Sequence, residues 1–201
     1  MAMMDVQLNS WMLFGHAEKH HADTEIVSLL GGGKKHRYQY RDFARRTQQL
    51  MHALDKLGLQ KGIPVATLAW NGWRHLELYF AVPCTGRVLH TLNLRLSTED
   101  LTYIIDHAQD GAIFADGDLL QILEKIGPDG LKSVKHIVAM GDHAETSLPN
   151  VVDYEDLISG ESEHYDAIDI AENTPMGLCY TSGTTGRPKG AVYTHRSTVL
   201  H

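Results

Sequence analysis

Cysteine is scarce in this chain, which has only Cys84 and Cys179 among its 201 residues. Two cysteines exclude the disulfide framework of small secreted domains and are typical of a reducing compartment. The sequence also lacks an apolar run long enough to span a membrane, because the longest, at 78–84, ends at a proline and a cysteine. Its first residues lack the basic-then-apolar order of a signal peptide. We therefore expect a cytoplasmic protein whose two thiols are buried and inert.

The chain has no excess of basic residues. It carries 18 Lys and Arg against 25 Asp and Glu, a formal net charge of −7 with histidine neutral. Nucleic acids and anionic membranes both require a concentrated basic face, so this balance argues against either as the main partner. The 43% of hydrophobic residues is enough for a core, and the 21% of charged residues suits a solvated surface.

Segments of strand-like and helix-like pattern alternate along the first 140 residues. Short apolar runs bounded by Gly, Pro or polar residues predict strands, and apolar positions at helical spacing predict helices. Such alternation is typical of an α/β fold with a mostly parallel sheet flanked by helices. We expect strands at 24–30, 38–40, 64–70, 87–91, 111–115, 134–140 and 176–180, and helices at 6–21, 43–57, 73–82, 98–108, 119–126 and 153–158.

One window departs from this core-and-surface pattern. After the strand expected at 176–180, the chain places four hydroxyl side chains within five positions and follows them with glycines and a lysine. The glycines let backbone N–H groups converge on an anion, and the lysine supplies a compact positive charge. This set suits a polyphosphate. The candidate binding residues are Thr181, Ser182, Gly183, Thr184, Thr185, Gly186 and Lys189.

The loop is not a Walker A loop. Pro188 precedes Lys189 and Gly190 follows it, where Walker A has glycine before the lysine and Ser or Thr after it. Residues 191–193 read as a strand rather than as the start of a helix. The sequence therefore predicts a strand–loop–strand hairpin, and a Walker-type kinase or ATPase is disfavoured.

The run Tyr180-Thr-Ser-Gly-Thr-Thr-Gly-Arg-Pro-Lys-Gly190 resembles the phosphate-loop signature of the adenylate-forming superfamily, which contains acyl-CoA synthetases, luciferases and peptide-synthetase adenylation domains. Residues 86–105 and 193–196 resemble the medium- and long-chain fatty acyl-CoA synthetase branch. Leu94 departs from that branch, which commonly has proline there. The resemblance covers essentially the whole chain.

The resemblance implies a reaction in two halves. A carboxylate attacks the α-phosphate of ATP to give an acyl-adenylate and pyrophosphate, and the thiol of coenzyme A then displaces AMP. The loop would hold the β- and γ-phosphates, and Thr181 could assist in ligating Mg²⁺. The small-molecule substrate would be a carboxylate of the fatty-acid class, with CoA bound mostly outside this chain. Members of the family are often homodimers.

The resemblance also indicates that machinery is missing. The family's downstream glutamate motif, ribose-binding aspartate and C-terminal domain with its catalytic lysine are not in the sequence. We expect an inactive N-terminal fragment: residues 1–175 form the sheet-and-helix part, and 176–201 form a strand, the loop and a following strand. Two alternatives stay open, a non-catalytic MgATP-binding or interaction module and a ligase for aryl or other carboxylic acids.

Several other residues invite functional interpretations that we set below structural ones. His16, His20 and His21 could ligate zinc, but a solvated helix face is favoured. Trp70 and Trp73 suit core and loop packing rather than base stacking. We expect Asp106 and Asp110 to lie on a helix surface rather than to form an acid–base pair. We expect His195 at the start of a helix, and His201 near the acyl or nucleotide pocket of the family fold.

Overall fold

The computed structural model describes residues 5–141, 146–181 and 186–201. Its helices are α1 (Ser10–His20), α2 (Tyr40–Lys56), α3 (Trp73–Cys84), α4 (Thr98–Ala108), α5 (Leu120–Gly130), α6 (Tyr154–Ile158) and α7 (His195–Leu200), with 3-10 turns η1 (Gly31–Gly33) and η2 (Gly117–Leu119). Its strands are β1 (Glu25–Leu29), β2 (Lys35–Gln39), β3 (Pro64–Leu68), β4 (Val88–Thr91), β5 (Ala112–Asp116), β6 (His136–Met140), β7 (Val151–Asp153), β8 (Pro175–Thr181) and β9 (Lys189–Thr194).

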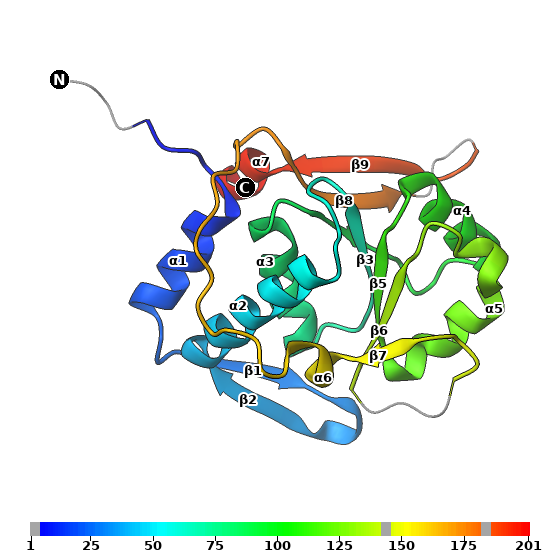
Figure 1. Cartoon of the computed structure of the whole chain (residues 1–201), viewed down its shortest axis with the longest axis horizontal. Helices are drawn as coiled ribbons and strands as arrows, with labels where there is room; N and C mark the ends of the chain where they lie inside the picture. The colour runs from blue at the N-terminus through cyan, green and yellow to red at the C-terminus, as the bar shows by residue number, and fades with distance from the viewer. Residues whose placement is uncertain (1–4, 142–145, 182–185) are drawn as a thin grey trace.

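Seven strands form one sheet in the order β7-β6-β5-β3-β4-β8-β9. Every neighbouring pair in it is parallel except β8 and β9, which are antiparallel. The first two strands form a separate antiparallel pair below the main sheet (Figure 1). The α/β fold with a mostly parallel sheet flanked by helices is therefore confirmed.

Helices cover both faces of the sheet, because successive strand residues point to opposite sides. On β5, Phe114 packs into one apolar core with α2 and α3, while Ile113 packs into the other with α4 and α5. Val138 and Ile137 divide in the same way on β6. Figure 1 shows α1, α2 and α3 on one side of the sheet and α4 and α5 on the other.

Three details differ from the sequence-based expectation. The structure adds a short strand, β7, in the region expected to be loop apart from one helix. Helix α5 breaks at Gly127, whose φ of 70° is left-handed, and then gains one more turn from Pro128 to Gly130. Proline suits the first position of that turn because the missing N–H would have no helical partner there. Helix α7 continues the chain after β9, and His195 is its first residue.

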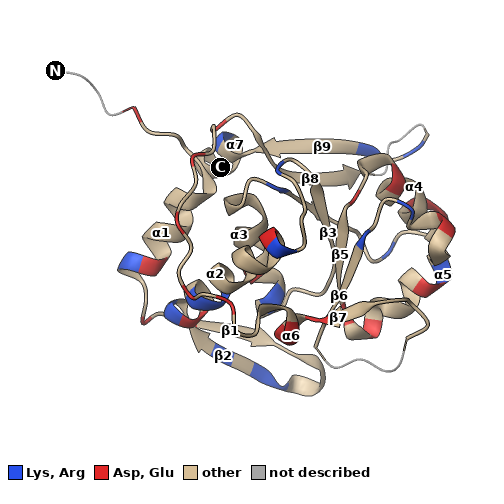
Figure 2. Cartoon of the chain, viewed as in Figure 1, with Lys and Arg blue, Asp and Glu red and all other residues tan. Residues whose placement is uncertain are grey.

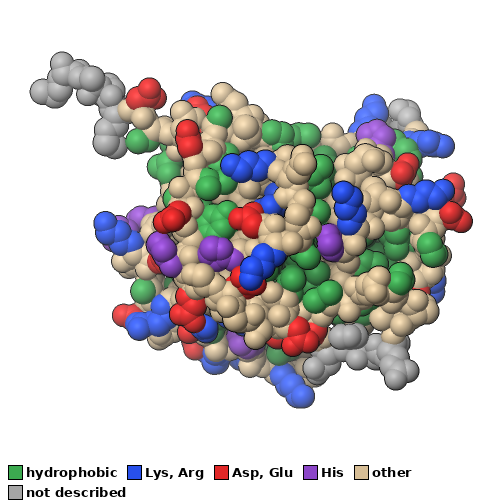
Figure 3. All heavy atoms as spheres, in the orientation of Figure 1, with side chains coloured by type: hydrophobic (Ala, Val, Ile, Leu, Met, Phe, Trp, Pro, Cys, Tyr) green, Lys and Arg blue, Asp and Glu red, His purple; other side chains and the backbone are tan. Residues whose placement is uncertain are grey.

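Charged residues are dispersed over the visible face. Figures 2 and 3 show basic and acidic side chains of the described residues interspersed among hydrophobic and polar ones rather than gathered into one basic patch. Among the described residues, no helix has both the length and the apolar character needed to cross a membrane.

A buried ion network joins the helices on one face. The Glu77 carboxylate on α3 is fully buried and lies 2.8 Å from Nε of Arg46 on α2. Tyr154 on α6 donates its hydroxyl to Glu77 at 2.6 Å, and Arg46 also pairs with Glu155 at 2.8 Å. Burial raises the pKa of Glu77, and the Arg46 guanidinium and the Tyr154 hydroxyl oppose that rise. The network therefore holds α2, α3 and α6 in one arrangement.

Arg46→Ala leaves the Glu77 carboxylate buried without its cation. We expect the free energy of unfolding, measured in urea, to fall by about 3–5 kcal/mol. Arg45→Ala is the matched control on the same helix, because Arg45 pairs with Glu163 at the surface, and its loss is expected to cost at most about 1 kcal/mol. Equal losses in the two variants would contradict the role given to the buried pair.

The first and last helices meet through a buried histidine. The Ser10 N–H on α1 donates to Nδ1 of His195 on α7 at 3.2 Å, so this nitrogen must be unprotonated. Burial lowers the pKa of His195 below its ordinary value of 6.5. The unfolded chain therefore binds a proton at this position more readily than the folded chain does.

Stability should accordingly fall as the pH drops through and below the ordinary histidine pKa, because the unfolded state then binds more protons. We expect the urea midpoint of the wild type to fall between about pH 7 and pH 5.5, and His195→Gln to lose less over the same interval. His164→Gln, at an exposed histidine, is the control for removal of an imidazole side chain. An identical loss in wild type and His195→Gln would refute this contribution.

Candidate phosphate-binding site

The β8–β9 hairpin brings the two described ends of the predicted loop together. Thr181 at the end of β8 pairs in register with Lys189 at the start of β9, and both are exposed. Gly186, also exposed, has a φ of 123°, which a residue with a side chain rarely adopts. The predicted strand–loop–strand arrangement is confirmed. The remaining predicted loop residues, Ser182, Gly183, Thr184 and Thr185, lie outside the described residues.

The sheet topology determines where this hairpin turn lies. Because β8 is parallel to β4, its carboxyl end lies at the same edge as the carboxyl ends of β3, β4, β5 and β6. Open α/β sheets bind their ligands outside this edge. Thr181 and Lys189 therefore lie at the edge where such sheets bind their ligands.

Gly190 has a packing role beside the loop. It faces Tyr180 across the hairpin, and a Cβ atom placed on it would meet Leu178 Cδ1 at 3.0 Å and the Tyr180 ring at 3.2 Å. A side chain at this position would displace the Leu178 side chain or the Tyr180 ring. The glycine that follows Lys189 thus allows the strand next to the loop to pack closely, in addition to any freedom it gives the backbone.

A buried His–Asp pair lies beside Tyr180 of β8. Nδ1 of His90 on β4 lies 2.8 and 2.9 Å from the two carboxylate oxygens of Asp110, and both side chains are fully buried. The His90 ring is 5.3 Å from the ring of Tyr180. The prediction that Asp110 lies on a helix surface is wrong, because Gln109 ends α4 in the left-handed conformation and the chain turns Asp110 inward. Asp106, by contrast, is exposed.

The two cysteines differ. Cys84 is buried as predicted, and burial raises the pKa of its thiol to about 12. The prediction that Cys179 is also buried is wrong, because it is only partly covered on β8. Next to it, the side chains of Tyr79, Leu89, Met176 and Tyr193 help to line an apolar hollow of about 300 Å³.

The histidine cluster on α1 carries no metal site. The rings of His16, His20 and His21 lie close together, with centroids 4.9 and 5.3 Å from that of His16. Within the described part of the chain, no group of three or more His, Cys, Asp or Glu side chains could hold a metal ion. His201, which we expected near a pocket, is the exposed last residue.

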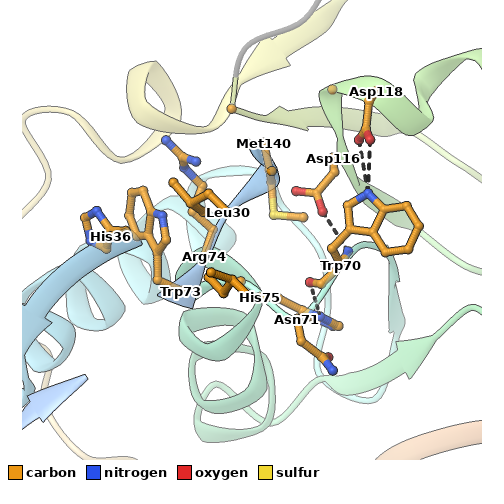
Figure 4. Close-up of a pocket in the computed structure, with 15 residues that line it drawn as sticks. Leu30, His36, Trp70, Asn71, Trp73, Arg74, His75, Asp116, Asp118 and Met140 are labelled. Carbon is orange, nitrogen blue, oxygen red and sulfur yellow. Dashed lines mark hydrogen bonds between the residues drawn. The ribbon is translucent and has the colours of Figure 1, made fainter. Parts of the chain in front are cut away.

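A cavity elsewhere on the carboxyl edge was not predicted. It has a volume of about 800 Å³ and lies beside the ends of β3, β5 and β6 and the β1–β2 hairpin (Figure 4). Trp70 donates its backbone N–H to Asp116 at 2.7 Å and its indole N–H to Asp118 at 3.0 Å. Trp73 has the His36 ring stacked 4.2 Å from its own and the Arg74 guanidinium 4.0 Å from its centroid.

None of the described residues of the predicted loop lines this cavity. Trp73 is 9% exposed, which agrees with a packing role. Trp70, expected at the end of a buried strand, is 55% exposed, because β3 ends at Leu68. The sequence signal for the cavity is the placement of Trp70 and Asp116 near the carboxyl ends of two buried strands, β3 and β5.

The structure is an α/β domain with a mostly parallel sheet, and its last two strands form an antiparallel hairpin that turns at the carboxyl edge. The family described as "AMP-binding enzyme" matches residues 13–200, and the chain belongs to this family.

Curated relatives include several CoA ligases. The chain is 45% identical over 99% of its length to a 3-methylmercaptopropionyl-CoA ligase of Ruegeria lacuscaerulensis. It is 43% identical to a medium-chain-fatty-acid–CoA ligase of Ectopseudomonas oleovorans and 42% identical to a long-chain-fatty-acid–CoA ligase of Thermus thermophilus, again over 99% of its length. It spans only 37, 37 and 36% of these three relatives.

Solved structures share the fold. The anthranilate CoA ligase AuaEII, crystallised with anthranoyl-AMP, superposes with a TM-score of 0.83 at 21% identity, covering 96% of this chain and 36% of that one. ATP-bound MatB from Rhodopseudomonas palustris gives a TM-score of 0.71 at 24% identity, covering 94% and 35%. At these identities the likeness extends to the fold alone.

Gly190→Ala tests the packing of the hairpin. The added methyl meets Leu178 and the Tyr180 ring, and we expect the free energy of unfolding to fall by about 1–3 kcal/mol. Gly177→Ala on β8 is the control, because its Cβ would meet nothing closer than 3.7 Å. The measurement is urea unfolding followed by far-UV circular dichroism, and a Gly190→Ala protein as stable as the control would contradict the close packing.

Proposed function

We propose that the chain is part of an AMP-forming acyl-CoA ligase in which the turn between β8 and β9 binds the triphosphate of ATP. The observation that carries the proposal is the intact signature at 180–190, located at the carboxyl edge of a parallel sheet. The chain's membership of the AMP-binding enzyme family and its relatives among CoA ligases support it.

In the proposed first half-reaction, a substrate carboxylate oxygen attacks the α-phosphorus of ATP. The bond from that phosphorus to the bridging oxygen breaks, and pyrophosphate leaves with the bond's electron pair. Lys189 would neutralise charge that accumulates on the departing phosphates, and the hydroxyl- and glycine-rich turn would donate hydrogen bonds to them. In the second half, the thiol of CoA would displace AMP and form the thioester.

Thr181 is the residue of this chain proposed to contact Mg²⁺. Its hydroxyl is a hard oxygen ligand at an exposed position across the hairpin from Lys189, and Mg²⁺ typically binds through a few protein oxygens together with substrate phosphates. The donor type and the position therefore fit the ion, which would add positive charge beside the phosphates.

For the acid, we propose a fatty acid. Identity is 42–43% to the two fatty-acid–CoA ligases, against 31% to a trans-cinnamate:CoA ligase of Petunia hybrida and 27% to a hydroxybenzoate–CoA ligase of Thauera aromatica. The 45% identity to the 3-methylmercaptopropionyl-CoA ligase makes a short thioether acid the second candidate. Two alternatives would replace both candidates: an aryl acid as the substrate, or a chain that binds MgATP without catalysis.

The test is carboxylate-dependent pyrophosphate release, measured on the 201-residue chain and on the full product of its gene. We expect release only from the longer protein, with medium- or long-chain fatty acids favoured over methylmercaptopropionate and benzoate. Release from the 201-residue chain would show that it needs nothing further. Saturable MgATP binding without release from either protein would favour the binding module.

Lys189→Ala in the longer protein should lower pyrophosphate release about 100- to 1,000-fold, because a charged donor aimed at the leaving phosphates is lost. Lys132→Ala is the matched control, since Lys132 is an exposed lysine whose ion pair is with Asp129, three residues earlier in the chain. An unchanged rate of pyrophosphate release in Lys189→Ala, with the fold intact by circular dichroism, would contradict the proposed role of the loop in the reaction.

A further inference from the structure

Helix α4 contacts the hairpin on both sides of its turn. Before the turn, the Tyr180 hydroxyl and Nδ1 of His107 lie 2.6 Å apart and share a hydrogen bond. After the turn, the Arg187 guanidinium lies 5.0 Å from the centroid of the Tyr103 ring. Tyr103 and His107 are four residues apart on α4, so they occupy one face of the helix, with ring centroids 5.3 Å apart.

Helix α4 is a firm support for these contacts. Ser97 caps its first turn by accepting the Asp100 N–H at 3.0 Å. Its buried face is apolar and packs into the core, through Leu101, Ile104 and Ile105. Beyond its last turn, Asp110 is held by His90 in the fully buried pair already described.

Neither contact is explained by ordinary surface pairing. Within the described part of the chain, Arg187 has no carboxylate at ion-pair distance, so the Tyr103 ring is its charge-compatible partner. Tyr180 is only partly buried, and its hydroxyl could have been solvated, yet the missing side chain of Gly190 lets its ring settle between β9 and α4. Both contacts therefore restrain the short chain segments on which the turn is mounted.

We propose that Tyr103 and His107 are positioning residues for the β8–β9 hairpin. They hold Arg187 and Tyr180 against α4 and so keep Lys189 in place for the triphosphate of ATP. The part that concerns ATP rests on the proposed function, whereas the restraint on the hairpin does not. Holding these described residues in place before ATP binds lowers the entropy lost on binding, so loss of the two contacts weakens ground-state binding of ATP. The effect should fall on KM for ATP more than on kcat.

The first test measures the restraint without any activity. Backbone hydrogen exchange of the 180–190 segment is followed by mass spectrometry in the wild type, Tyr103→Leu and His107→Ala. Trypsin cleavage after Lys189 gives a second readout, because Pro188 protects the bond after Arg187. We expect both variants to speed exchange and cleavage about tenfold or more, since a tethered end is released.

Matched variants separate the restraint from general damage to α4. Tyr103→Phe keeps the ring under Arg187 and should behave as wild type. Asp106→Ala changes an exposed carboxylate on the same helix and should also be silent. Tyr180→Phe removes only the hydroxyl, so it should match His107→Ala, and the double variant should be no faster than either single one. Unchanged exchange in the folded His107→Ala and Tyr180→Phe proteins would overturn the proposal.

The second test uses the full gene product and pyrophosphate release at varied ATP. Tyr103→Leu and His107→Ala should raise KM for ATP about 5- to 20-fold with kcat within about twofold. Faster exchange with an unchanged KM for ATP would contradict a role of Tyr103 and His107 in ATP binding. Faster exchange together with no pyrophosphate release from the wild type would reject the proposed function and leave the restraint standing.

Discussion

A parallel sheet is stable only when helices cover both of its faces, and most of this structure follows from that constraint. Strand residues alternate between two apolar cores, one on each face of the sheet. The helices that connect the strands must therefore be divided between both faces. On one face the covering layer also holds the buried Glu77, which Arg46 neutralises and Tyr154 bonds. This charge pairing joins α2, α3 and α6 on that face, and removal of one partner would leave a buried charge without compensation.

The last strand pair departs from the parallel pattern, and the candidate site lies at that departure. A parallel connection needs a crossover of a dozen or more residues, whereas antiparallel strands can be joined by a short turn. Turning β9 back along β8 places Thr181 and Lys189 side by side at the carboxyl edge. The cost is an edge strand whose Val192 and Tyr193 are 58% and 52% exposed.

The carboxyl edge of the sheet carries two distinct features. One is the β8–β9 hairpin, whose Tyr180 and Arg187 contact α4. The other is the cavity lined by Trp70, Trp73 and the carboxylates at the end of β5 and just after it. Parallel strands bring their loops to one edge, so a single fold offers several ligand-accessible places along it. Sequence motifs point to only the first of them, because the cavity is assembled from segments far apart in the chain.

The sequence by itself determined the α/β class, the limits of most elements and the hairpin form of the loop, because periodicity, glycine placement and the proline before Lys189 are local properties. It also carried the family resemblance, since an uninterrupted eleven-residue signature needs no tertiary contact to be read. Only the tertiary structure placed Asp110 against His90 and His107 against Tyr180. Those partners are 20 and 73 residues apart, and burial, which gives each contact its meaning, depends on the whole packed sheet.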